Sequence, residues 1–210
     1  HRLTARVKGE PRLESMGPAQ GLTFNGITDW LEVAPDRAAA QSALPTNAFS
    51  LTAWVLLNET QPDGGIVGFM QDNGDYEKGW LLGYARQNFS FVLSTKGADD
   101  GDGKLTRLNG GARIELGRWH YVVATYDAQT MRLYVDGKLD GQSTEQSGDI
   151  LYPERGRLAV AAYADDDELH PMDGSLFEVK VYDRAMPAEE IAEVAARNEK
   201  FLGYRASLND

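Results

Sequence analysis

The stretch RWHYVVATYDAQTMRLYVDG, residues 118–137, decides the fold. It contains two runs rich in aromatic and β-branched residues, Trp119–Tyr126 and Met131–Val135, a composition typical of strands. The four residues between them have the length of a hairpin loop. Asp136-Gly137 then ends the second run with a strong turn pair. The stretch therefore predicts two neighbouring antiparallel strands.

Strand-like runs extend in both directions from this hairpin, from about Gly21 to Tyr182. In Phe49–Leu57, every second residue from Phe49 is apolar, so one face is continuously hydrophobic. Loops rich in glycine and aspartate separate the remaining runs, which are Leu22–Phe24, Trp30–Val33, Ile66–Met70, Trp80–Tyr84, Phe89–Ser94, Leu158–Tyr163 and Ser175–Tyr182. Many short strands of this kind indicate an all-β sandwich or barrel.

One short C-terminal helix is predicted over Pro187–Phe201. Pro187 suits the first helical turn, because its missing N–H is no loss there. Ile191, Val194 and Ala195 form a narrow apolar stripe that can lie on the sandwich. The 210 residues fit a single β domain, with residues 1–20 as a leading edge strand or tether and residues 21–205 as its body.

The acidic balance limits the partners. The chain has 32 acidic and 21 basic residues, a formal net charge of −11, so we expect no nucleic-acid binding and no attraction to anionic membranes. There is no cysteine, and no stretch reads as a membrane span or signal peptide. Because the chain begins with His1, we expect a fragment of a longer protein with flanking domains.

Several motifs occur in a recognisable order. They are Phe24-Asn25-Gly26, Asp29-Trp30-Leu31-Glu32-Val33, Phe49-Ser50-Leu51-Thr52-Ala53-Trp54-Val55, Gly79-Trp80-Leu81-Leu82, Phe91-Val92-Leu93, the 118–137 stretch, and Gly174-Ser175-Leu176-Phe177-Glu178-Val179-Lys180-Val181-Tyr182-Asp183-Arg184-Ala185-Met186. Together they resemble the bacterial laminin-G-like jelly-roll domains of the concanavalin A-like lectin/glucanase superfamily. The resemblance covers about 170 residues and implies a two-sheet antiparallel jelly-roll sandwich.

The resemblance also carries expectations about function. Relatives bind carbohydrates or proteins, often with calcium, and are commonly appended to larger extracellular proteins. It therefore implies a secreted or periplasmic, lectin-like binding module. The glucanases of the superfamily carry an E-x-D-x-x-E strand that aligns their two catalytic carboxyls. No glutamate here is followed two positions later by an aspartate, so we expect no enzyme activity, and we assign His120 a structural role.

Calcium has several candidate ligands. In relatives it often lies where the opening turn meets the closing strand, which here implicates Asn25 and position 177, but Phe177 cannot ligate a metal. Three acidic loops offer alternatives, because hard cations prefer carboxylate oxygens. The first loop supplies Asp72 and Asp75, the second spans residues 99–103, and the third supplies Asp166. A solvated loop without an ion is the alternative for each.

The ligand surface is predicted from aromatic residues at loop edges and from nearby carboxylates. The candidates are Trp30, Tyr76, Trp80, Tyr163, Asp165 and Asp167, with Tyr152 as a looser candidate. Trp54 and Trp119 match positions that the family buries. Carbohydrate binding is the first hypothesis. A protein-interaction or adhesion domain and an architectural domain without sugar affinity are the alternatives. An exposed aromatic strip would favour the first, and a flat apolar patch the others.

Overall fold

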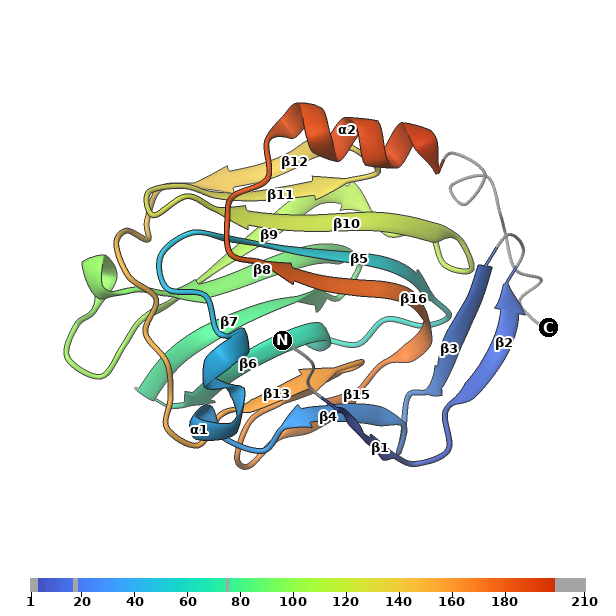
Figure 1. The fold of residues 1–210 in the computed structure, drawn as a ribbon, viewed down its shortest axis with the longest axis horizontal. Coiled ribbons are helices and arrows are strands. Elements are labelled where there is room, and N and C mark those ends of the chain that lie inside the picture. The colour runs from blue at the N-terminus through green and yellow to red at the C-terminus, as the bar shows by residue number, and fades with distance from the viewer. Residues whose placement is uncertain (1–3, 17–18, 75, 199–210) are drawn as a thin grey trace.

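The computed structural model describes residues 4–16, 19–74 and 76–198. Within them, two antiparallel sheets of seven strands face each other as the layers of a sandwich (Figure 1). The predicted two-sheet jelly-roll architecture with one short C-terminal helix is confirmed.

Each sheet draws its strands from most of the described chain. In spatial order, the first sheet contains β1 (Arg6–Lys8), β4 (Trp30–Ala34), β13 (Arg157–Val160), β6 (Gly64–Asn73), β7 (Tyr76–Ala85), β8 (Asn88–Ser94) and β9 (Leu105–Arg113). The second contains β12 (Lys138–Ser143), β11 (Met131–Val135), β10 (Trp119–Tyr126), β5 (Phe49–Leu57), β16 (Asp173–Tyr182), β3 (Ala19–Asn25) and β2 (Arg12–Met16). Short helices α1 (Arg37–Ala40), η1 (Gln41–Ala43) and η2 (Lys96–Ala98) lie in the connections.

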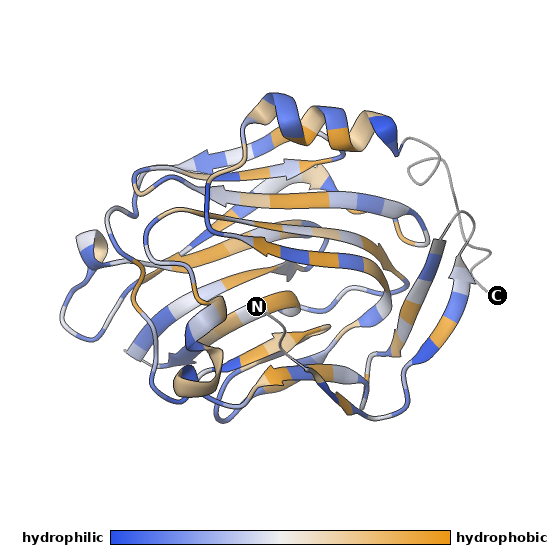
Figure 2. Ribbon diagram, viewed as in Figure 1, coloured by the Kyte–Doolittle hydropathy of each residue, from blue (hydrophilic) through white to orange (hydrophobic). Residues whose placement is uncertain are grey.

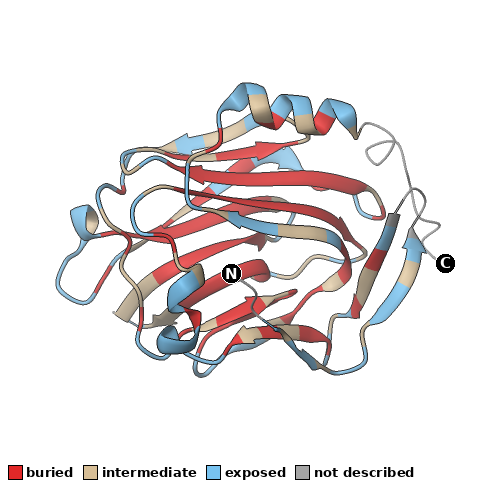
Figure 3. Ribbon diagram, viewed as in Figure 1, coloured by how far each residue is buried: buried red, intermediate tan, exposed pale blue. Residues whose placement is uncertain are grey.

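The main core lies between the two sheets. Phe49 and Leu51 of β5 belong to it, together with Trp80 and Phe91 from the opposite sheet. Figure 2 shows apolar and polar residues alternating along several strands, and Figure 3 shows burial concentrated in the central strands. All nine residues of β5 are buried, including those on the outward face. A second layer must therefore cover that face.

The covering element is helix α2 (Ala188–Arg197). Its Ile191 and Ala195 join Trp54, Trp119 and Tyr121 in a second hydrophobic cluster, which explains the burial of both tryptophans. The helix begins at Ala188, one residue after the predicted start, and Pro187 occupies the N-cap position. The predicted end at Phe201 lies outside the described residues.

The 118–137 hairpin forms β10 and β11 as predicted. Asp136 adopts a left-handed conformation with φ of 53°. Its carboxylate lies 3.1 Å from Nδ1 of His120 and accepts a hydrogen bond of 3.0 Å from the backbone N–H of Tyr121. His120 is buried beside this turn and contacts it through Asp136, the arrangement that a structural role expects.

The first twenty residues contribute an edge strand to each sheet. β1 pairs with β4 at the edge of the first sheet, and β2 pairs with β3 at the edge of the second. This segment therefore spans both layers of the sandwich (Figure 1).

A small hairpin, β14 (Ala162–Ala164) and β15 (Leu169–Pro171), packs against β6. The sequence predicted one continuous run over Leu158–Tyr163, which is wrong because Ala161, with φ of 62°, breaks it. A Cβ at Gly65 would lie 2.2 Å from the carbonyl oxygen of Ala162, so glycine permits the close packing. The hairpin thus covers part of the first sheet's outward face.

Candidate functional site

Three of the predicted sugar-stacking aromatics are buried. Trp80 is fully buried in the main core, where its Nε1 donates to the Tyr152 hydroxyl at 3.0 Å. Trp30 is 7% exposed and lies in a cluster with residues of β14. Tyr163, itself part of β14, is 3% exposed and lies in a cluster with residues of the first sheet. Their rings offer no open face to a sugar, so these three predictions are wrong. The sequence did not reveal the β14–β15 hairpin, which helps to cover Trp30 and carries Tyr163 onto the sheet.

Tyr76 is half-buried at the beginning of β7. The Lys78 amino group lies 4.5 Å from the centroid of its ring. Tyr76 therefore stays partly accessible, as does Tyr152, the looser candidate of the predicted aromatic set.

The three acidic loops converge at the tip of the β6–β7 hairpin. Asn73 donates from Nδ2 to Asp167 Oδ1 at 2.6 Å, which joins the first loop to the third. A Cβ at Gly103 would lie 2.1 Å from the carbonyl oxygen of Glu77, so the second loop packs directly on β7. We call this group the acidic rim; its members are Asp72, Glu77, Asp100, Asp102 and Asp165–Glu168.

Burial and mutual repulsion perturb the acidic rim. Asp165 is fully buried, and its Oδ1 accepts hydrogen bonds from the backbone N–H groups of Asp167 and Glu168 at 3.2 and 2.7 Å. Desolvation raises the pKa of Asp165 above its usual range. Desolvation followed by the charge of Glu77 raises the pKa of Asp72.

Part of the acidic rim has the geometry to hold a cation. Carboxylate oxygens of Asp165, Asp166 and Asp167 lie within 4.8 Å of one another. Asp72 interacts electrostatically with Asp165, so the structure brings these predicted residues together. Asp75 lies outside the described residues.

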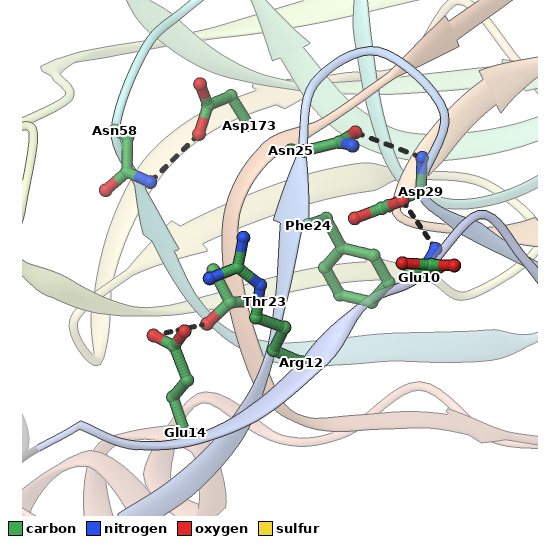
Figure 4. A pocket seen from close by; sticks show the side chains of 9 residues that line it. All are labelled: Glu10, Arg12, Glu14, Thr23, Phe24, Asn25, Asp29, Asn58 and Asp173. Carbon is green, nitrogen blue, oxygen red and sulfur yellow. Dashed lines mark hydrogen bonds between the residues drawn. The ribbon is translucent and has the colours of Figure 1, made fainter.

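A polar pocket of about 320 Å³, seen from close by in Figure 4, lies far from the acidic rim. β6 begins shortly after Asn58 in the sequence and runs ten residues to the acidic rim, a rise of about 30 Å. We call the pocket the end pocket; its lining residues are Glu10, Arg12, Glu14, Thr23, Phe24, Asn25, Asp29, Asn58 and Asp173.

Strand register builds the end pocket. Asp173 begins β16 directly opposite Asn25 at the end of β3, and Asn58 follows β5. Asn58 donates from Nδ2 to Asp173 Oδ1 at 2.9 Å. Thr23 donates to Glu14 Oε2 at 3.4 Å across the β2–β3 pair. Five chain segments therefore present amide, hydroxyl and carboxylate groups to one space (Figure 4).

The calcium geometry expected at this turn does not fit. Asn25 Oδ1 accepts hydrogen bonds from the backbone N–H groups of Ile27, Thr28 and Asp29 at 2.9, 2.9 and 3.2 Å. Its oxygen holds the turn and is not free for a metal. Phe177 does not line the pocket. The prediction of Asn25 as a ligand is therefore wrong.

Asp29 is the most constrained acid of the end pocket. It is 4% exposed, and its Oδ1 accepts hydrogen bonds from the Glu10 backbone N–H at 2.9 Å and from the Thr28 hydroxyl at 3.0 Å. Among the described residues it has no ion pair, and no donor reaches its Oδ2. Figure 4 shows that second oxygen turned toward the pocket.

Sequence reasoning missed most of the end pocket. Asp29 stands inside the 29–33 motif and Asp173 directly before the 174–186 motif, and neither was singled out as a site residue. Arg12 and Glu14 lay in the segment predicted to be an edge or tether. Only the strand register places these residues at one pocket, and the register is known only once the fold is known.

Comparisons with known proteins place this geometry in context. The sequence model described as the concanavalin A-like lectin/glucanases superfamily matches residues 25–192. Pappalysin-1 from Homo sapiens is 30% identical over 151 residues, which cover 67% of this chain and 9% of that protein. Pappalysin-1 from Mus musculus is 28% identical over 151 residues, again 9% of its length. The chain thus spans a small part of the curated relatives it matches.

Solved structures share the fold at low sequence identity. Domain 4 of a GH43 extracellular arabinanase from Geobacillus stearothermophilus, in complex with arabinotriose, matches with a TM-score of 0.58 and 15% identity, over 89% of this chain and 82% of that one. The binding domain of Paraclostridial Mosquitocidal Protein 1 matches with a TM-score of 0.66 and 11% identity, over 93% and 48%. No helix in the described ranges has the length and apolar character to cross a membrane.

Proposed function

The chain belongs to the concanavalin A-like lectin/glucanase superfamily, and from this premise we propose that it is a non-catalytic, carbohydrate-binding module of a larger extracellular protein. The small share of pappalysin-1 that the match covers supports a module within a longer chain. The arabinanase domain that shares the fold is a sugar-bound domain of an extracellular enzyme, which supports the ligand class and the location.

The end pocket is the observation that carries the proposal. Sugar sites combine hydrogen-bonding side chains with a concave surface, and ligand pockets have volumes from about 300 Å³ upward. The end pocket has 320 Å³ and offers the amide of Asn58, the hydroxyl of Thr23 and several carboxylates to sugar hydroxyls. The buried Phe24 ring closes one side. The hydrogen bonds among these residues preorganise the pocket.

Calcium is part of the proposal at the acidic rim. Asp165, Asp166 and Asp167 would hold it, since calcium takes about six to eight oxygens and favours carboxylates. A bound cation would favour the ionised form of Asp165, whose pKa burial raises. Calcium there would stiffen the loop between β14 and β15.

The test is a glycan and polysaccharide binding screen, followed by calorimetry on the best ligand, with calcium and with a chelator. We expect Asn58→Ala in the end pocket to weaken binding about tenfold. Asp167→Asn in the acidic rim should leave the affinity unchanged. Both variants are checked for a native melting transition.

Two outcomes would redirect the proposal. Loss of binding in Asp167→Asn with retention in Asn58→Ala would move the sugar site to the acidic rim. Failure to bind every broad glycan class would reject carbohydrate binding and favour the protein-interaction alternative.

A further inference from the structure

We propose that the end pocket binds the protonated amine of an unacetylated amino sugar, an inference that rests on the carbohydrate binding proposed above. It names the ligand class of the same pocket. A neutral sugar can form hydrogen bonds with the hydroxyl and amide groups of the pocket, but it does not balance the negative charge of the pocket's carboxylates.

Asp29 is the first step of the argument. A buried carboxylate is costly unless a positive charge or several hydrogen bonds compensate it. Asp29 is 96% buried, and its described donors, the Glu10 backbone N–H and the Thr28 hydroxyl, are both neutral and both reach Oδ1. Its Oδ2 faces the pocket without a donor from the described chain, and it is not among the fully enclosed atoms that lack a partner, so the pocket side of the carboxylate is open to solvent or to a ligand. A cationic ligand group at that oxygen would complete the site.

The surrounding charge points the same way. The pocket lining holds four carboxylates, from Glu10, Glu14, Asp29 and Asp173, and one guanidinium, from Arg12. Arg12 is exposed and forms no ion pair with the described residues, so the lining as a whole keeps a negative balance of charge. Carboxylates in a low-dielectric cleft raise the local concentration of cations. The net charge of −11 adds to this attraction.

The arrangement suits an ammonium group on a sugar ring better than a bare metal ion. Calcium needs about six to eight converging oxygens at about 2.3–2.6 Å. In the end pocket, Asn25 Oδ1 and one oxygen each of Asp29 and Asp173 already accept hydrogen bonds. An ammonium needs only about three acceptors. The volume of 320 Å³ also accommodates a ring whose hydroxyls meet Thr23 and Asn58.

The experiment compares two probes that differ only in the amine. A chitosan tetrasaccharide carries free amines, and its fully N-acetylated counterpart carries none. We expect the free amine to bind at least about tenfold more tightly, the size of one charge-assisted hydrogen bond. In Asp29→Asn, which keeps an acceptor at Oδ1, the two affinities should come within about twofold, as expected once that charge-assisted bond is lost.

Charge-matched variants separate the pocket from the net charge. Arg12→Gln should raise the affinity for the free amine about two- to threefold, because it removes the competing cation. Glu193→Gln and Arg197→Gln make the same charge changes on the exposed face of α2 and should have no effect. If Asp29→Asn fails to fold, Glu14→Gln supplies the same test from a partly exposed position.

The outcomes distinguish this inference from the proposed function. Equal binding of the two probes, or tight binding only to neutral glycans, overturns the amine inference while carbohydrate binding stands. Loss of amine binding on chelation overturns it in favour of a metal in the pocket. Absence of binding to any glycan overturns both.

Discussion

The acidic rim and the end pocket are both rich in carboxylates, yet they are built differently. In the acidic rim, Asp165 to Glu168 are consecutive, and their loop satisfies Asp165 with its own backbone N–H groups. In the end pocket, the acids come from positions as distant as Glu10 and Asp173, and strand register alone brings them together. The acidic rim is thus a property of loops, whereas the end pocket is a property of the fold.

This difference shows that acidic residues that are consecutive in the sequence and acidic residues that the fold brings together form different kinds of site. A run of acidic residues is easily recognised in the sequence. Its carboxylates, however, raise one another's pKa, and such a run favours a solvated loop. The buried Asp29 stands between Thr28 and Trp30 without any local sign of its role. The two ends should therefore respond differently to the same kind of change.

The largest contrast is expected from a pair of glycines, one at each end. Gly9 has φ of 70°, and a Cβ there would lie 2.1 Å from Asp29 Oδ1. Gly74 has φ of 60° and nothing within 4 Å of such a Cβ. A left-handed alanine costs about 1–2 kcal/mol and forced packing about 1–3 more. We expect Gly9→Ala to lower the free energy of unfolding by about 2–5 kcal/mol and Gly74→Ala by about 1–2 kcal/mol.

Urea unfolding of both variants measures this contrast. Gly9→Ala should also weaken ligand binding, because the clash displaces Asp29. Equal losses of stability at the two positions would show that the end pocket tolerates displacement and is no more constrained than the acidic rim.

Calcium should act on one end only. A ligand present at a hundredfold excess over its Kd stabilises the folded state by about 2.7 kcal/mol. For a chain of this size that corresponds to an increase in Tm of about 5–11 °C. We expect Asp166→Asn to abolish the calcium-dependent increase and Asp29→Asn to preserve it, as measured by differential scanning calorimetry. Abolition by Asp29→Asn instead would place calcium in the end pocket.

The overall fold was predictable because strand patterns are local. The alternation of Phe49–Leu57 and the hairpin at residues 118–137 each depend on neighbours in sequence, and both appear in the structure as β5, β10 and β11. The β14–β15 hairpin was not predictable from these patterns. Its packing depends on the absence of a side chain at Gly65, which no periodicity records.

The site was less predictable for a related reason. Trp80 stands in the sequence beside an acidic segment and was a ligand candidate whose pattern fits the core and the surface alike, but its direction follows from its pairing with Phe69 and Leu93 in adjacent strands. Asn25 was predicted as a calcium ligand from the resemblance, whereas its register partner Asp173 supplies a carboxylate to the end pocket. Side-chain direction and register are set by tertiary pairing, so single residues were misplaced within a correctly predicted sandwich.

A smaller effect is expected from pH at the acidic rim. A carboxyl whose pKa is raised on folding costs stability while it is ionised, and the cost disappears as the pH falls through the folded pKa toward the unfolded value of about 3.9. Because desolvation raises the pKa of Asp165, acidification from pH 7 should relieve this cost as the pH falls through the folded pKa. The gain in Tm should be smaller in Asp165→Asn than in the parent.

The charge-matched control for this titration is Asp100→Asn, an exposed position of the same acidic rim. It should leave the pH profile unchanged. A profile in which Asp165→Asn and the parent coincide would show that the burial of Asp165 does not perturb its titration.

The smallest effect is expected at Tyr76, and it is the sharpest test of which end binds sugar. Its ring is partly accessible and lies 4.5 Å from the Lys78 amino group. A stacking platform would lose about 0.5–2 kcal/mol of interaction on removal of the ring. If the end pocket holds the sugar, Tyr76→Ala should change glycan affinity by less than about twofold, since the ring lies about 30 Å away at the tip of β6–β7. Calorimetry on the parent and the variant decides: a tenfold loss would make the acidic rim the sugar site and leave the end pocket without its proposed ligand.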